Sequence, residues 1–174
     1  MDKNYNWYTI YVKSHHEKRV YKDLSEQKIQ AFLPLRKINR KWSDRTKLIE
    51  EPLFANYIFV KISCREYLQV LNLRSVIYFI SFDRGPYVVS ENVIQAIKDI
   101  ISRNISFEIT SQTYAKGDII EFSKGPFKGM SGEVLNIEGS KYLIIKMEHI
   151  NQAIIIKTGR KYLVNQSQAV LCET

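Results

Sequence analysis

Residues 117–134 read GDIIEFSKGPFKGMSGEV, and this stretch decides how the second half of the chain folds. Four of the seven glycines in the chain fall within it, at Gly117, Gly125, Gly129 and Gly132. Glycine adopts left-handed backbone angles that other residues resist, and the residues between the first two glycines alternate between two faces. The spacing therefore predicts two short strands joined by a tight turn, although a Gly-Pro pair alone indicates only an ordinary hairpin.

The residues around this stretch continue the strand pattern to the end of the chain. We expect strands at 118–123, 131–137, 141–148, 152–157 and 161–165. Several short strands at such close spacing are typical of a small barrel. Residues 102–114 are rich in Ser, Thr, Asn and Gln and lose the helical period, so we interpret them as a linker.

The residues before the linker mix strands and helices. We expect strands at 7–12, 53–62, 77–82 and 87–89, and helices at about 15–30 and from residue 91 onward. Ser14 and Glu17 have the spacing of a capping box at the start of the first helix. Apolar residues recur at helical spacing in the second helix, at Val93, Ile94, Ile97 and Ile101. The sequence predicts two domains, the first α/β and the second all-β.

The positive charge of the chain is unevenly distributed. The net charge is +8 over 174 residues. Residues 1–101 hold 17 Lys/Arg and 11 Asp/Glu, a net +6, which leaves +2 for residues 102–174. Many small proteins are mildly basic for no special reason, but the excess in the first part favours an anionic partner there.

Two basic segments account for much of this charge. Residues 36–47 carry six basic residues and one acid between two expected strands, so they predict a protruding hairpin or loop. Trp42 within it could stack on a base while the cations meet phosphate, or it could pack back on the sheet. The second segment lies at the start and along the exposed face of the first helix, and consists of Lys13, His15, His16, Lys18, Arg19 and Lys22. It could bind an anion or could simply keep the helix soluble.

An aromatic strand is expected at residues 53–60. Leu53, Phe54, Tyr57 and Phe59 cannot all point to one side of a strand, because successive side chains face opposite sides. Some of this aromatic surface should therefore be exposed, or covered by a partner or by the second domain.

Several classes of protein are disfavoured. No nucleophile with an acid–base partner lies near His15, His16 or His149, and no phosphate-binding glycine loop is present, so we do not expect an enzyme. Cys64 and Cys172 lie far apart and outside metal-ligand spacing. No apolar run approaches the roughly 20 residues that a membrane-spanning helix needs, and the polar start is unlike a signal peptide. We expect a cytoplasmic protein without a membrane segment, a metal or a cofactor.

The glycine pattern resembles the KOW motif of small SH3-like barrels, through Gly117, Asp118, Gly125, Phe127, Gly129 and Gly132. With Trp7-Tyr8, the capped helix, Pro34 and the strand from Pro52 to Val60, nearly the whole chain resembles the NusG family. Residues 40–60 resemble the specialised members of the family, RfaH and, more closely, the UpxY-type antiterminators. The resemblance implies an α+β fold: an NGN α/β sandwich at 5–103, a linker at 104–114 and a KOW barrel at 115–170.

The resemblance also implies a partner and a site. NGN domains bind the clamp helices of RNA polymerase in an apolar depression and suppress pausing and termination. By motif position the depression would be lined here by Tyr11, Phe54, Ala55, Asn56, Tyr57 and Phe82.

Specialised members also bind the displaced non-template DNA strand. The corresponding surface would comprise Lys13, His15, His16, Lys18, Arg19, Gln27 and Arg74, and Arg40, Lys41 and Trp42 of the basic hairpin would add to it. Asp23 and Glu26 stand where RfaH is basic, and residues 65–69 differ from its bridging loop. The barrel would bind a ribosomal protein or another factor. The expected function is antitermination on specific surface-polysaccharide operons; the alternatives are a general elongation factor or a ribosome- or RNA-binding KOW protein.

Overall fold

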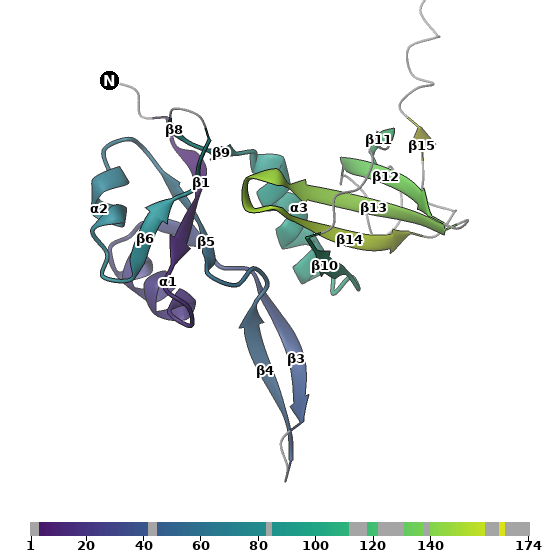
Figure 1. Cartoon of the computed structure of the whole chain (residues 1–174), viewed down its shortest axis with the longest axis horizontal. Helices are drawn as coiled ribbons and strands as arrows, with labels where there is room; N and C mark the ends of the chain where they lie inside the picture. The colour runs from purple at the N-terminus through teal and green to yellow at the C-terminus, as the bar shows by residue number, and fades with distance from the viewer. Residues whose placement is uncertain are drawn as a thin grey trace, which may run out of the picture. The chain divides into compact units, whose positions relative to one another are not determined.

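The computed structural model describes residues 4–41, 45–82, 85–111, 118–121, 131–137, 140–158 and 164–165. These residues form two compact units, Met1–Glu91 and Asn92–Thr174, which Figure 1 draws together. The division falls at the start of a helix that the sequence assigns to the first domain, so the expected boundary at residues 103–115 stays a prediction. Each unit is described by itself.

The first unit is built on an antiparallel sheet with strand order β2-β5-β1-β6, and β9 also pairs with β1. Its strands are β1 (Asn6–Val12), β2 (Gln30–Phe32), β5 (Tyr57–Ile62), β6 (Val76–Phe79) and β9 (Val88–Val89). A short hairpin, β7 (Ser81–Phe82) with β8 (Gly85–Pro86), follows β6. The expected strand at 53–62 is wrong at its start, because residues 53–56 form a turn and β5 begins only at Tyr57.

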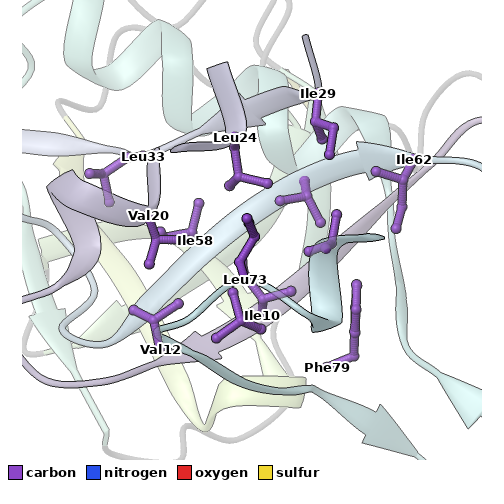
Figure 2. Close-up of a cluster of buried hydrophobic side chains, with 13 residues drawn as sticks. Ile10, Val12, Val20, Leu24, Ile29, Leu33, Ile58, Ile62, Leu73 and Phe79 are labelled. Atoms are coloured by element: carbon purple, nitrogen blue, oxygen red, sulfur yellow. The ribbon is translucent and has the colours of Figure 1, made fainter. Parts of the chain in front are cut away.

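One face of this sheet carries the hydrophobic core, shown in Figure 2. Strand residues such as Ile10 and Ile58 are fully buried together with Val20 and Leu24 of helix α1 (Glu17–Glu26). Val70 of the short helix α2 (Tyr67–Leu71) belongs to the same cluster. Each fully buried side chain of this size contributes roughly 1.5–3 kcal/mol, so the cluster holds both helices on this face.

Helix α1 is shorter than expected and the predicted capping box is wrong. The N-cap residue is His16, and no side chain caps the helix. Glu17 is turned inward, is 5% exposed and accepts a hydrogen bond from the backbone N–H of Asn56 at 2.9 Å. The helix ends at Glu26, because Lys28 adopts a left-handed φ of 59° and Ile29 turns into the core.

The basic segment forms the expected protruding hairpin. Strands β3 (Leu35–Lys41) and β4 (Thr46–Pro52) pair only with each other and extend away from the main sheet in Figure 1. The backbone N–H of Leu53 donates to the carbonyl of Pro34 at 2.7 Å, so the chain leaves and rejoins the sheet at one point.

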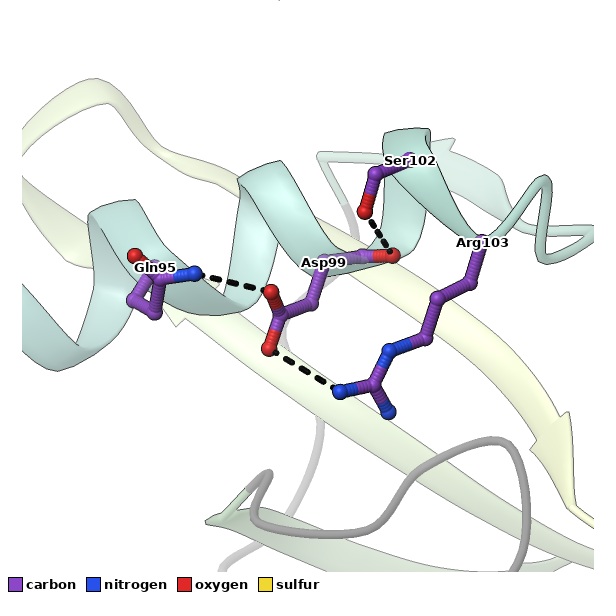
Figure 3. Close-up of polar contacts among 4 residues, drawn as sticks. All are labelled: Gln95, Asp99, Ser102 and Arg103. Atoms are coloured by element: carbon purple, nitrogen blue, oxygen red, sulfur yellow. Dashed lines mark hydrogen bonds and ion pairs between the residues drawn. The ribbon is translucent and has the colours of Figure 1, made fainter.

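The second unit begins in helix α3 (Glu91–Ser102), which buries the apolar side chains Ile94, Ala96, Ile97 and Ile100. Asp99 lies on a more polar face of this helix (Figure 3), where it accepts from Gln95 at 2.8 Å and pairs with Arg103 at 3.5 Å. Residues four apart on a helix are neighbours, and such exposed pairs stabilise it modestly. The expected second helix is confirmed.

The rest of the second unit is a six-stranded antiparallel sheet with order β10-β14-β13-β12-β11-β15. Its strands are β10 (Glu108–Thr110), β11 (Asp118–Glu121), β12 (Ser131–Ile137), β13 (Ser140–Met147), β14 (Gln152–Thr158) and β15 (Val164–Asn165). The five strands predicted beyond the linker are confirmed. Within residues 102–114, which the sequence predicts to be the linker, β10 pairs with β14. The linker itself stays a prediction.

The glycine-rich motif is described only in part. Gly132 lies in β12 opposite Ile120, and Asp118 pairs with Val134. Gly117, Gly125, Phe127 and Gly129 lie outside the described residues. The two units together confirm an α+β fold with antiparallel sheets and a β-rich second half. Among the described residues, no helix is long and apolar enough to cross a membrane.

The Glu17–Asn56 hydrogen bond yields a stability prediction. Glu17→Ala leaves the part-buried N–H of Asn56 without its acceptor, so we expect the first unit to lose about 1–3 kcal/mol of unfolding free energy. Urea denaturation followed by the NMR signals of β1 and β5 amides measures it. Glu26→Ala is the matched control, because Glu26 makes only an exposed pair with Lys22 at 3.6 Å. Equal effects of the two substitutions would contradict this role for Glu17.

His149 yields a prediction on pH. It lies in the short 3-10 helix η2 (Glu148–Ile150), where burial lowers its pKa to about 4. The unfolded chain takes up this proton below about pH 6.5 and the folded chain does not until about pH 4. The second unit should therefore lose stability as the pH falls from 7 to 5, by about 1 kcal/mol after allowance for solvent screening.

His149→Gln should remove this component of the pH dependence. Urea midpoints followed through β13 and β14 amides at both pH values measure it in the full chain. Parallel pH profiles for the two proteins would show that His149 does not couple folding to protonation.

Candidate functional site

Three tyrosines form a row across the face of the first sheet opposite the core. Tyr11 on β1 is in register with Tyr57 on β5 and with Tyr78 on β6. The rings of Tyr11 and Tyr78 stack with centroids 5.1 Å apart, and Tyr57 meets Tyr11 edge-on at 5.3 Å. Tyr78 is 47% exposed and the other two are half-buried. We call these three residues the tyrosine row; it presents aromatic surface to solvent.

Asn56 fixes one end of the tyrosine row. Its φ of 71° is left-handed, which Asn tolerates better than most residues. Its side-chain Nδ2 donates to the Tyr11 hydroxyl at 2.9 Å, and its carbonyl accepts from the Val12 N–H at 2.8 Å. With the bond from its own N–H to Glu17, these contacts join the turn before β5 to the end of β1 and the start of α1.

Tyr57 of the tyrosine row is uncharged at physiological pH. The pKa of Tyr57 is raised above its ordinary value, first by burial and then by the neighbouring hydroxyls of Tyr78 and Tyr11. Phenols in this state combine an apolar ring with a hydroxyl that donates or accepts, and such groups are enriched at protein interfaces. The row is therefore suited to contact an apolar segment with some polar groups.

The structure brings together most, but not all, of the residues predicted to line the depression. Tyr11, Asn56 and Tyr57 lie side by side, and Ala55 is exposed in the adjoining turn. Tyr78 was missed, because only the strand register shows that it stacks on Tyr11. Nothing in its local sequence distinguishes it from Ile77, which is also exposed.

Phe54 and Phe82 differ from the expectation. Phe54 is 1% exposed and packs edge-on against Phe59 at 6.1 Å, so its place in the lining of the depression stays a prediction. Replacing it with Ala would remove core volume, at a typical cost of about 3–5 kcal/mol. Phe82 is 71% exposed but lies apart from Tyr11 along the sheet. The Ile80 N–H donates to the carbonyl of Thr9, so the residues after Tyr78 lie further along β1, beyond Tyr11.

The predicted basic residues of the first helix region gather around two loops. The Lys13 N–H donates to the carbonyl of Ser75 at 2.9 Å, and His16 Nδ1 lies 2.8 Å from the Ser75 hydroxyl. Arg74 is therefore placed beside a loop that is distant in sequence. Lys13, His15, Arg19 and Arg74 are exposed, and we call them, with the half-buried His16, the basic loop patch.

The remaining basic candidates lie elsewhere on the first unit. Gln27, at the far end of α1, accepts from Gln69 Nε2 at 3.0 Å. Lys18 Nζ donates to the carbonyl of Glu50 at 2.8 Å, which ties α1 to the hairpin. Arg40 and Lys41 are exposed on the hairpin, and Trp42 lies outside the described residues. Within the described part of the chain, no group of His, Cys, Asp and Glu could hold a metal ion.

Comparison with known proteins identifies the family of the chain. A family model described as transcription termination factor nusG matches residues 5–98. The transcription termination/antitermination protein NusG of Rickettsia felis is 25% identical over 146 residues, which are 78% of this chain and 76% of the relative. The protein of the same name from Rickettsia prowazekii is 24% identical over 146 residues, with the same coverage.

Solved structures are also similar. A structure of Thermotoga maritima NusG covers 89% of this chain and 93% of its own, at 18% identity and a TM-score of 0.49. A structure of the MjSpt4:Spt5 complex covers 91% and 98%, at 12% identity and a TM-score of 0.30. The family-model match spans more than half of the chain, from β1 into α3. The protein belongs to the NusG family of transcription termination and antitermination factors.

Proposed function

We propose that this protein binds RNA polymerase through the tyrosine row and suppresses pausing and termination on specific operons. The observation that carries the proposal is the partly exposed row of Tyr57, Tyr11 and Tyr78, held by Asn56 within the residues that the NusG family model matches. The resemblance of the first domain to NGN domains supports the clamp helices as the segment contacted.

The proposed mechanism involves no bond making. An apolar helix tip packs on the three rings, while the hydroxyls of Tyr11 and Tyr78 meet polar groups at its rim. A protein fixed on one side of the polymerase cleft and contacting the other favours the closed state over the open states that pausing requires. It shifts an existing equilibrium by the difference in its affinity for the two states.

Nucleic acid is the second proposed partner. The basic loop patch offers the exposed cations Lys13, Arg19 and Arg74 to the phosphates of a displaced non-template strand, with Lys18 in α1 and Gln27 directly after it. Contacts with phosphate supply affinity that falls with salt, and base contacts supply preference for particular operons. We propose that the second unit recruits a ribosomal protein or another factor.

A general elongation factor is the alternative. The Rickettsia relatives, named for both termination and antitermination, match across both units, which favours a role that is not limited to a few genes. Genome-wide mapping of the protein in its own cells separates the two: enrichment on a few operons supports the specialised factor. Occupancy of all transcribed genes would support the general one.

The tyrosine row predicts a binding defect without a folding defect. Tyr78→Ala removes the most exposed ring of the row, and we expect polymerase affinity to fall about tenfold or more, as for a central aromatic contact. Leu68→Ala is the matched control, because Leu68 is 65% exposed on α2, which packs on the opposite face of the sheet. Biolayer interferometry with immobilised RNA polymerase measures both.

Tyr11→Phe tests the orientation of the row. It keeps the ring and removes the hydroxyl that receives the Asn56 hydrogen bond, so a smaller loss of affinity should result. The proposed surface would be wrong if Tyr78→Ala bound as tightly as Leu68→Ala.

The proposed activity predicts longer transcripts. Added to its own polymerase on a template with a pause site and a terminator, the wild-type protein should shorten the pause and raise read-through. Tyr78→Ala should need a higher concentration for the same effect. Unchanged pausing and termination at saturating wild-type protein, with polymerase binding intact, would contradict antitermination.

A further inference from the structure

We propose that the β3–β4 hairpin is a duplex-binding ribbon, which contacts the phosphates of double-stranded DNA without reading bases. This deepens the proposed function and rests on its nucleic-acid part. The tyrosine row and the basic loop patch lie on other parts of the first unit and are not needed for this contact.

Charge is sorted along the length of the hairpin. Its acids, Glu50 and Glu51, lie at the base, opposite Lys37 and Arg36. The outer half carries Arg40, Lys41, Arg45 and Lys47 and, among its described residues, no acid. Glu51 alone faces both Arg36 and Arg40, at 3.9 Å from each. The described outer half therefore has an excess of positive charge that the hairpin does not neutralise.

The strand register places two of these positive charges opposite each other. Arg40 and Lys47 are direct partners across the two strands, so two like charges face each other where Cβ atoms lie about 4.5–5.5 Å apart. Such a pair is unfavourable in the free protein. An anion that bridges the two side chains removes the repulsion, which is what a phosphate would do.

Both faces of the ribbon carry cations. Alternation places Arg36, Arg40 and Lys47 on one face, and Lys37 and Lys41 on the other. The body of a two-stranded ribbon fits a major groove about 12 Å wide, where each face meets the phosphates of one wall. A ribbon charged on both faces suits this position better than a flat surface does.

Single-stranded nucleic acid is the competing ligand for the hairpin. Proteins that bind single strands stack bases on aromatic side chains. The described hairpin residues, 35–41 and 45–52, supply cations, and Trp42, which lies outside the described residues, is the one aromatic residue between them in the sequence. The test below therefore compares a duplex with the matching single strand.

The attachment of the hairpin directs it away from the sheet. The Leu53–Pro34 backbone bond closes its base, and Lys18 of α1 donates to the Glu50 carbonyl at 2.8 Å. Figure 1 shows the two strands extending beyond the rest of the first unit. The charged outer half can thus reach a duplex without contact between that duplex and the core of the unit.

Fluorescence anisotropy with the full chain tests the proposal, using a labelled duplex of mixed sequence and the matching single strand. Arg40→Gln with Lys47→Gln should weaken duplex binding several-fold and lower the slope of log K against log salt by about two. The same double variant should change single-strand binding much less. The charge-preserving swap Arg40→Lys with Lys47→Arg should retain duplex binding.

Lys22→Gln with Lys28→Gln is the matched control, since it removes the same charge from exposed positions within α1 and just after it, outside the hairpin. Wild-type duplex affinity in the Arg40/Lys47 Gln variant, or an equal loss in the control, would overturn the proposal. Two cross-tests separate this proposal from the polymerase-binding proposal. Tyr78→Ala should keep duplex binding, and Arg40→Gln with Lys47→Gln should keep polymerase binding.

Discussion

The hydrogen bonds at Asn56 are the constraint on which the first unit depends. Its N–H, side-chain amide and carbonyl bind Glu17 of α1 and Tyr11 and Val12 of β1, so the turn before β5 is tied to two other elements. A buried carboxylate such as Glu17 is costly unless it is hydrogen-bonded, and the turn needs a residue that tolerates positive φ. The core face and the tyrosine row meet at this junction. The same hydrogen bonds therefore stabilise the fold and position the proposed binding surface.

The two faces of the first sheet serve different purposes. Isoleucine and valine side chains on one face pack against the apolar side chains of α1 and α2. The other face carries the tyrosine row. The base of the hairpin is closed by the backbone bond between Leu53 and Pro34, so the surfaces proposed for polymerase and for duplex DNA lie on separate parts of the first unit.

The sequence predicted local features well and tertiary ones poorly. Alternation and glycine spacing located the strands of the second unit, except β10, whose three residues are too few to show a period. The capping box failed because Glu17 bonds to Asn56 rather than to its own helix. Phe54 is buried because a turn interrupts the expected strand, and Tyr78 joins the site only through its register with Tyr11. The partner of Glu17, the burial of Phe54 and the position of Tyr78 all depend on contacts between residues distant in the chain, which a single sequence does not show.

The most direct test of the account is an NMR titration of the ring-labelled tyrosines with RNA polymerase. Tyr67 is an internal reference, because it stacks on Phe79 at 4.3 Å on the core face of the sheet. We predict that the signals of Tyr11, Tyr57 and Tyr78 shift or broaden together at substoichiometric polymerase while that of Tyr67 changes least. Loss of the Tyr67 signal with the other three unchanged would contradict the assignment of the tyrosine row as the polymerase-binding surface.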